Sequence, residues 1–134
     1  MDIFKILLIE DNPFFKGIWD SIIGRATKSS YQLDWAVNDF MASELLEKND
    51  YDLIISDIIL AGSKTGIDLW IEHDCKDSTY IFTSSIPQDV FLEFMKQTDK
   101  APVPFIAKPL NLNYCIDFLS QVILKGQRTK ATKD

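Results

Sequence analysis

The sequence predicts an α/β protein, an open, doubly wound and mostly parallel sheet in a single domain. Apolar stretches of strand length alternate along the chain with stretches whose apolar residues recur at helical spacing. The third strand stretch, residues 51–57, carries the run Leu53, Ile54 and Ile55, which is apolar on both faces, as expected for a central parallel strand covered by helices. The connections are short, and a right-handed crossover through each helix then returns the chain to a parallel sheet.

Size and charge restrict the classes of function. A chain of 134 residues with 46% hydrophobic residues is long enough to bury its own core. A net charge of −6 disfavours binding to nucleic acid or to an anionic membrane. No apolar run approaches the roughly 20 residues that cross a bilayer, and the first residues lack a signal-peptide pattern, so we expect a cytoplasmic protein. Cys75 and Cys115 lie in helical patterns and are expected to be free thiols.

The first half of the chain predicts three strands and two helices. Strand patterns cover residues 3–9, 31–37 and 51–57. The first helix is expected from Pro13, which suits the first helical position, to about Ser29, with Asn12 as its cap. Asn38 or Asp39 caps a second, shorter helix that ends near residues 49–50.

The second half predicts two further strands and three helices. A loop with two glycines, residues 58–66, leads to a helix over residues 67–75, and residues 80–82 form the fourth strand. Pro87 opens the next helix. Residues 103–107, flanked by prolines, suit an edge strand. The last helix is expected from residue 112 to residue 125. Residues 1–125 would then form the domain, and residues 126–134 a polar tail or the start of a linker.

Polar residues follow four of the five predicted strands. Glu10 and Asp11 follow the first, Asp57 the third, Thr83 the fourth and Lys108 the fifth. Each alone has an ordinary explanation as a turn, cap or surface residue, but the carboxyl ends of parallel strands share one edge, where ligands bind. Three carboxylates there would repel one another by about 1–4 kcal/mol per close pair. Lys108 offsets one charge, and a divalent ion with oxygen ligands, such as Mg²⁺, would offset the rest.

These residues resemble the receiver domain of two-component response regulators, the CheY-like domains. The resemblance covers about residues 3–125 and rests on the pair Glu10-Asp11, on Asp57, on Thr83 and on Lys108-Pro109, in the family's order and spacing. It implies a flavodoxin-like fold with five parallel strands in the order 2-1-3-4-5 and helices on both faces.

The resemblance also implies a function, phosphorelay signal transduction through an aspartyl phosphate. Asp57 would be the phosphoacceptor, and Asp11, Asp57 and the backbone carbonyl of Ile58 would bind Mg²⁺, with Glu10 acting through bound water. Thr83 and Lys108 would contact the phosphoryl oxygens. Such a domain promotes only its own phosphorylation and dephosphorylation, so we do not expect an enzyme acting on other molecules.

Partners follow from the same resemblance. The donor would be a phosphohistidine on a sensor kinase or a phosphotransfer protein, because the chain's own His73 lies in a helix pattern. An output protein or domain and a phosphorylation-dependent homodimer remain open. Phe14 and Ile18 either present apolar area to the partner or pack inward. Phe105 is either the aromatic residue that moves with Thr83 on phosphorylation or an ordinary core residue.

The loop after Asp57 departs from the family's pattern. Family members commonly carry a proline where this chain has Ala61, and their glycine is matched one place later by Gly66. Ile59 is apolar where some relatives carry a polar residue that orients attacking water. We therefore expect a fairly long-lived phosphorylated form.

Three other functions compete with this interpretation. A flavin-binding module needs a phosphate loop after the first strand, where Glu10 and Asp11 would repel phosphate. A haloacid-dehalogenase-type phosphatase needs a second Asp where Ile59 stands, and its nucleophile follows strand one. A receiver-like protein-interaction module that is not phosphorylated stays as the alternative.

Overall fold

The computed structural model describes residues 3–73, 77–101 and 103–132, and within them the side chains up to residue 127. Five strands alternate with five helices along this part of the chain. The strands are β1 (Phe4–Ile9), β2 (Tyr31–Ala36), β3 (Leu53–Asp57), β4 (Thr79–Ser84) and β5 (Phe105–Ala107). The helices are α1 (Pro13–Ala26), α2 (Asp39–Lys48), α3 (Gly66–His73), α4 (Gln88–Lys96) and α5 (Leu112–Thr132).

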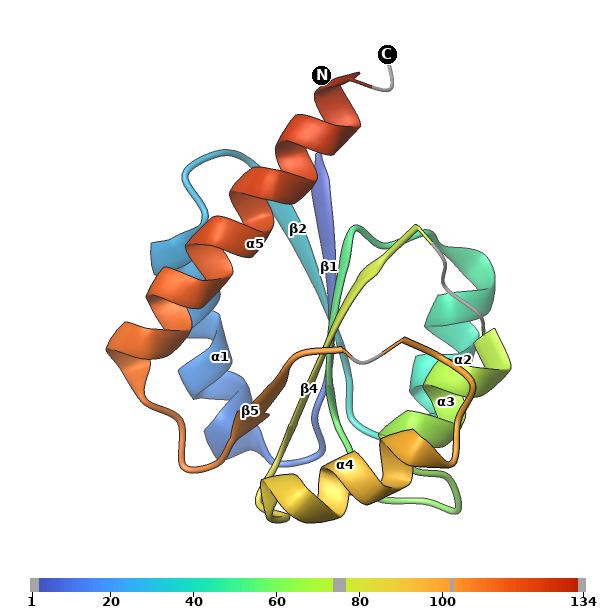
Figure 1. Cartoon of the computed structure of the whole chain (residues 1–134). Coiled ribbons are helices and arrows are strands. Elements are labelled where there is room, and N and C mark those ends of the chain that lie inside the picture. The colour runs from blue at the N-terminus through green and yellow to red at the C-terminus, as the bar shows by residue number, and fades with distance from the viewer. Residues whose placement is uncertain (1–2, 74–76, 102, 133–134) are drawn as a thin grey trace.

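The strands form one parallel sheet in the order β2-β1-β3-β4-β5 (Figure 1). Helices α1 and α5 cover one face, and α2, α3 and α4 cover the other. The predicted fold class, strand order and coverage of both faces are therefore confirmed. Cys115 is a buried free thiol, as expected, whereas Cys75 lies outside the described residues.

Alternation along the central strands produces two separate cores. Leu7 and Ile54 face the layer of α2, α3 and α4, while Leu8 and Ile55 face the layer of α1 and α5, because successive side chains of a strand point to opposite faces. All four are fully buried. This burial on both faces explains why the central strands are continuously apolar rather than alternating.

Helix starts follow the predicted caps. The side chain of Asn12 accepts a hydrogen bond from the backbone of Phe14, with Pro13 at the first helical position, and Asn38 accepts from Met41 at the start of α2. Helix α1 ends at Ala26, three residues earlier than the sequence suggested, because Thr27 is extended and the polar residues after it have no core to cover.

Several other element boundaries differ from the expectation; for example, β3 begins at Leu53 rather than residue 51, and β4 covers Thr79–Ser84 rather than residues 80–82. Strand β5 begins at Phe105 rather than residue 103, because Pro104 has no N–H for a ladder bond, although its carbonyl still accepts from Phe82 at 3.0 Å. Helix α5 continues through Gly126 to Thr132 and runs past the end of β1 (Figure 1). A Cβ at Gly126 would lie 3.1 Å from the ring of Phe4, so the glycine lets this helix approach β1 closely. Whether residues 126–134 also serve as a linker stays a prediction.

Candidate functional site

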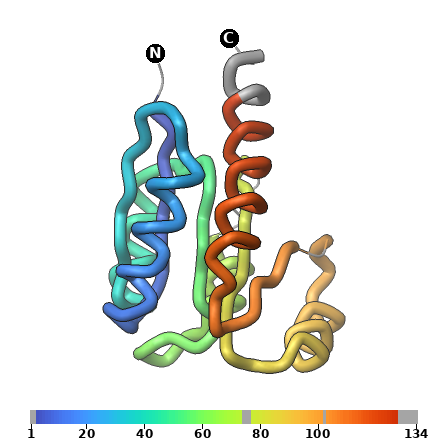
Figure 2. Tube along the Cα trace, turned by 90° about the vertical axis from the view of Figure 1, so that its left-hand side faces the viewer, coloured from blue at the N-terminus to red at the C-terminus, as the bar shows by residue number. Residues whose placement is uncertain are grey.

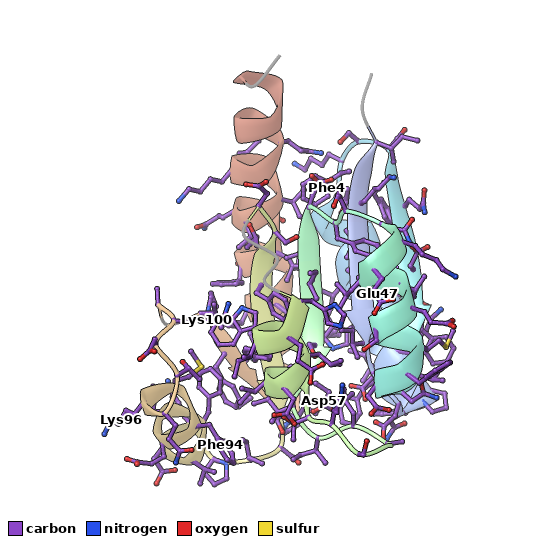
Figure 3. The ribbon with its side chains drawn as sticks, turned by 90° about the vertical axis from the view of Figure 1, so that its right-hand side faces the viewer. Phe4, Glu47, Asp57, Phe94, Lys96 and Lys100 are labelled. Atoms are coloured by element: carbon purple, nitrogen blue, oxygen red, sulfur yellow. The ribbon has the colours of Figure 1, made fainter. Side chains whose placement is uncertain are left out.

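The strand ends meet at one edge of the sheet, opposite the end marked by Phe4 (Figure 3). Asp57 and Thr83 are paired in register as the adjacent residues of β3 and β4. Glu10 directly follows β1, and Lys108 directly follows β5. Glu10 and Thr83 are fully buried and Asp57 is 5% exposed, so most of the polar cluster is shielded from bulk water.

The turn after β1 carries two carboxylates and is held by hydrogen bonds between the backbone of Glu10 and two residues of β2. The N–H of Glu10 donates to the carbonyl of Ala36 at 3.0 Å, and the indole Nε1 of Trp35 donates to the carbonyl of Glu10 at 2.7 Å. One oxygen each from Glu10, Asp11 and Asp57 lie within 4.8 Å of one another. Asp11 is the exposed member of the three, so the acidic cluster opens to solvent on its side.

Lys108 joins two of these carboxylates. Its Nζ lies 2.7 Å from Oε1 of Glu10 and 2.7 Å from Oδ2 of Asp57, and its side chain is 8% exposed. The ring centroid of Phe15 lies 4.0 Å from the same Nζ, an arrangement that also favours a cation. The peptide between Lys108 and Pro109 is cis. The ammonium group is therefore held between acids and an aromatic face.

The pKa values of Glu10 and Lys108 are both raised, for different reasons. Burial raises the pKa of Glu10, and although the hydrogen bonds from Lys108 and Asn12 oppose this, the pKa stays above its usual value. Burial acts to lower the pKa of Lys108, but the hydrogen bonds to Asp57 and Glu10 outweigh it and raise the pKa. Lys108 is therefore charged at neutral pH and supplies one fixed positive charge to the site.

The loop after β3 begins by hydrogen bonding back to the site. The N–H of Ile59 donates to Oδ1 of Asp57 at 3.2 Å, and the N–H of Ile58 donates to the carbonyl of Thr83 at 3.2 Å. The carbonyl of Ile58 accepts from Gly66 at 2.9 Å, which leaves one of its lone pairs for another donor or a cation. Ile59 itself is 55% exposed beside the acid.

Thr83 and Phe105 lie on neighbouring strands but differ in environment. The hydroxyl of Thr83 is buried and has no hydrogen-bond partner in the described part of the chain. Phe105 is half-buried and stacks on Phe91 of α4, with ring centroids 4.7 Å apart. A buried hydroxyl without a partner is costly, so Thr83 is ready to bond any acceptor that enters the site.

The donor set fits a divalent cation. Three carboxylates and one ammonium leave two negative charges uncompensated at the strand ends. Carboxylate and carbonyl oxygens are the ligands that Mg²⁺ and Ca²⁺ prefer, and a site with few protein ligands leaves room for water and phosphate. Glu10, Asp11, Asp57 and the carbonyl of Ile58 would hold such an ion, and Lys108 alone does not neutralise them.

The residues predicted to face a partner separate in the structure. Phe14 is 68% exposed at the start of α1, so it does not pack inward, whereas Ile18 is half-buried and packs against the core shared with α5. His73 ends α3, where its Nε2 lies 3.2 Å from the hydroxyl of Ser43. These positions leave Phe14 and Ile59 as exposed apolar side chains following the ends of two adjacent strands.

Sequence reasoning missed three contributors to the site. Trp35, which binds the carbonyl of Glu10, and Phe15, which lies under Lys108, were counted only as strand and helix residues. Asp39 was considered only as a helix cap, yet its carboxylate binds the loop after Asp57. Trp35 is the penultimate residue of β2 and Phe15 is the third residue of α1, so their positions near strand ends give only a weak signal. Nothing in the sequence marks Asp39 as a contact of the loop.

No family model matches the sequence, and no curated protein matches it. Solved structures do match it. The two-component transcriptional regulator AraC from Clostridium phytofermentans ISDg has a TM-score of 0.74 and 20% identity, covering 96% of this chain and 98% of that one. A CheY-like response regulator receiver domain protein from Methanospirillum hungatei JF-1 has a TM-score of 0.68 and 18% identity, covering 98% and 99%. A response regulator protein from Burkholderia pseudomallei, solved with a phosphorylated aspartic acid, calcium ion and citrate, has a TM-score of 0.64 and 19% identity, covering 98% and 75%.

The chain therefore has the fold of the receiver domains of two-component response regulators. At the edge where the strands end it carries an acidic cluster, Glu10, Asp11 and Asp57, that could hold a metal ion. Within the described residues, no helix combines the length and the apolar character needed to span a membrane.

Proposed function

We propose that this protein is a phosphoacceptor receiver domain, in which Asp57 accepts a phosphoryl group from a phosphohistidine on a partner protein in a Mg²⁺-dependent reaction. The donor would be a sensor histidine kinase or a histidine phosphotransfer protein. The phosphorylated domain would then change its contacts with an output protein or domain. This activity would take place in the cytoplasm without contact to nucleic acid or membrane.

One observation carries the proposal. Residues nearly a hundred positions apart meet in one cluster, where Lys108 Nζ lies 2.7 Å from both Glu10 and Asp57 and Asp11 completes the acidic group. An ion-pair network made only for stability would gain little from a third, exposed carboxylate, because exposed charges contribute little. A reaction that brings in a cation and a phosphoryl group would use all of these residues.

The chemistry follows from the positions of the side chains. An oxygen of Asp57 attacks the phosphorus, a new O–P bond forms, and the N–P bond to the donor imidazole breaks, so that the imidazole leaves with the electron pair. Such a reaction needs positioning and charge neutralisation rather than an added base. Ile59 and Lys108 orient the two oxygens of Asp57. Mg²⁺, when bound, would offset the charge of the acids and of the phosphoryl oxygens.

Thr83 and Phe105 would link the chemistry to the surface. The unpartnered hydroxyl of Thr83 is one register position from Asp57 and would donate to a phosphoryl oxygen. Phe105 is only half-buried and rests on Phe91, so it can change its packing when Thr83 moves. Helix α4, which carries Phe91, would transmit this change.

A relative with the same fold supports the assignment. The response regulator from Burkholderia pseudomallei carries a phosphorylated aspartic acid and a calcium ion in its solved structure. If this chain acts in the same way, Asp57 is the matching carboxylate, because it is the buried Asp that ends β3 within reach of a lysine.

The direct test uses a small phosphoryl donor. Incubation with acetyl phosphate and Mg²⁺, followed by intact-mass spectrometry, should give a protein heavier by one phosphoryl group. Asp57→Asn should abolish the gain, while Asp117→Asn, an exposed Asp on α5, should leave it unchanged. No gain in the unmodified protein would instead favour the receiver-like interaction module that is not phosphorylated.

A further inference from the structure

The loop between β3 and α3, residues 58–65, is held at its tip by a carboxylate from a different element. Asp39 is the first residue of α2, and its Oδ2 accepts hydrogen bonds from the backbone N–H groups of Ser63 at 3.3 Å and Lys64 at 3.2 Å. The hydroxyl of Ser63 lies 3.4 Å from the same oxygen. The loop is the green segment at the lower end of the molecule in Figure 2, the end at which Figure 3 labels Asp57.

Gly62 makes this contact sterically accessible. Its φ of +123° lies in the region that side chains rarely adopt, and a Cβ at this position would lie 2.1 Å from Oδ1 of Asp39. The loop backbone therefore passes directly over the carboxylate. No residue larger than glycine fits here while the clasp between Asp39 and residues 63–64 is in place.

Asp39 is not needed to cap its own helix. Asn38 already accepts from the backbone of Met41 at 2.8 Å, which is the N-cap bond of α2. Burial acts to raise the pKa of Asp39, but hydrogen bonds from backbone amides of α2 and of the loop outweigh it and lower the pKa. The side chain is thus a charged acceptor directed at the loop.

Residues at both ends of the same loop contact Asp57, the proposed phosphoacceptor. Ile59 donates to Oδ1 of Asp57 at 3.2 Å, and Gly66 donates to the carbonyl of Ile58 at 2.9 Å. A Cβ at Gly66 would lie 2.1 Å from the carbonyl oxygen of Asp57, so the end of the loop also packs closely on the acceptor's backbone. The loop is therefore fixed at its base by the site and at its tip by Asp39.

We infer that Asp39 is a positioning residue for the acceptor site. It orders the loop and thereby fixes the amide of Ile59, which donates to Asp57, and the carbonyl of Ile58, which would be a ligand of a bound cation. This chain has Ala61 where a proline would restrict the loop, and the clasp supplies that restriction from outside. The inference rests on the proposed function for its effect on Mg²⁺, but not for its effect on the order of the loop.

The test compares Asp39→Ala with a matched control, Asp89→Ala. Asp89 is an acidic residue in the first turn of α4 and accepts from the next backbone amide at 3.1 Å, as Asp39 does at 2.9 Å, but within the described residues its carboxylate accepts no hydrogen bond from a loop. Both variants remove one negative charge from the first turn of a helix, although Asp39 is half-buried and Asp89 is exposed. Any difference between them therefore comes from the clasp.

Three measurements are made on each variant of the whole 134-residue chain. Amide hydrogen exchange at Ile59, Ser63 and Lys64 should become faster in Asp39→Ala but not in Asp89→Ala. The Kd for Mg²⁺, measured by titration, should rise about tenfold in Asp39→Ala, the usual effect of losing a partner that supports a metal ligand. Phosphorylation by acetyl phosphate should be slow at limiting Mg²⁺ and recover when Mg²⁺ is saturating.

Two further variants separate positioning from a general loss of stability. Asp39→Asn keeps one carbonyl oxygen as an acceptor and should recover part of the Mg²⁺ affinity. Gly62→Ala leaves the carboxylate in place but blocks the approach, and should match Asp39→Ala. If the unmodified protein neither binds Mg²⁺ nor takes up a phosphoryl group, the proposed function fails. The rate of amide hydrogen exchange at Ile59 in Asp39→Ala then still tests whether Asp39 orders the loop. If it does both, and Asp39→Ala keeps its Mg²⁺ affinity and its exchange at Ile59, the inference is wrong.

Discussion

Replacing Lys108 by methionine should destabilise the protein strongly, because it removes the cation that pairs two buried acids. The side chain is 8% exposed and makes two ion pairs of 2.7 Å, to Glu10 and to Asp57. With carboxylate oxygens within 4.8 Å of one another, each pair repels by about 1 kcal/mol at the dielectric of water and about 3.5 kcal/mol at an effective dielectric of 20. Breaking a buried pair on one side costs about 3–5 kcal/mol, so we expect a loss of about 3 kcal/mol in the free energy of unfolding.

Mg²⁺ should reduce this loss, because a divalent ion would neutralise the same carboxylates. Urea unfolding followed by circular dichroism, with EDTA and with Mg²⁺, measures both quantities. Lys16→Met is the control: Lys16 also forms an ion pair, with Asp20, and also lies over an aromatic ring, but it is 29% exposed. Its loss should stay below about 1 kcal/mol. Equal losses for the two variants, or a Lys108→Met loss that Mg²⁺ does not change, would refute the electrostatic account of the site.

Four further results are expected. Asp11→Asn should weaken Mg²⁺ binding while barely changing stability in EDTA, since Asp11 is exposed; a titration followed by urea unfolding checks both. Phe91→Ala should cost about 3–5 kcal/mol of unfolding free energy, because the ring is 2% exposed between two other aromatic rings. Ile59→Asn should shorten the lifetime of the phosphorylated protein, measured by mass spectrometry after the donor is removed; an unchanged lifetime counts against a role for Ile59. Tyr51→Phe should cost about 1.5 kcal/mol below pH 10, because the hydroxyl donates to Asp34 at 2.6 Å. Burial and Asp34 raise the pKa of Tyr51 above 10, so its contribution is complete below pH 10 and the difference between the two proteins should shrink above it.

Most of the fold could be predicted from the sequence because each element carries a strong local signal. Leu53, Ile54 and Ile55 indicate a strand buried on both faces, and such a strand requires helices on both sides of the sheet. Asn12 and Pro13 mark a helix start by themselves. Element boundaries were less predictable. Helix α5 continues past residue 125, where Gly126 lies close to Phe4, a residue far from it in the sequence.

The principal acids and the lysine could be predicted from their positions after the strands, but not the geometry around them. That Lys108 pairs with Glu10 as well as with Asp57 depends on the side-chain conformation and on Phe15 beneath it. The bonds from the loop to Asp39 join residues 24 and 25 apart in sequence, through a half-buried side chain that also suits a helix start. Exposed polar contacts between loops have no periodicity, so sequence patterns do not reveal them.

Two neighbouring side chains of the site, Asp57 and Thr83, differ in whether their polar atoms have hydrogen-bond partners. Asp57 is already bonded through both oxygens, to Lys108 and to Ile59, whereas the hydroxyl of Thr83 beside it is buried without a partner in the described part of the chain. Leaving such a hydroxyl unpaired costs about 1–3 kcal/mol, and a hydrogen bond to an oxygen of a phosphoryl group on Asp57 would recover that energy. A difference of this size shifts a two-state equilibrium by roughly 5- to 150-fold. If Asp57 accepts a phosphoryl group as proposed, a new bond to Thr83 would be large enough to reposition it and to change the packing of Phe105.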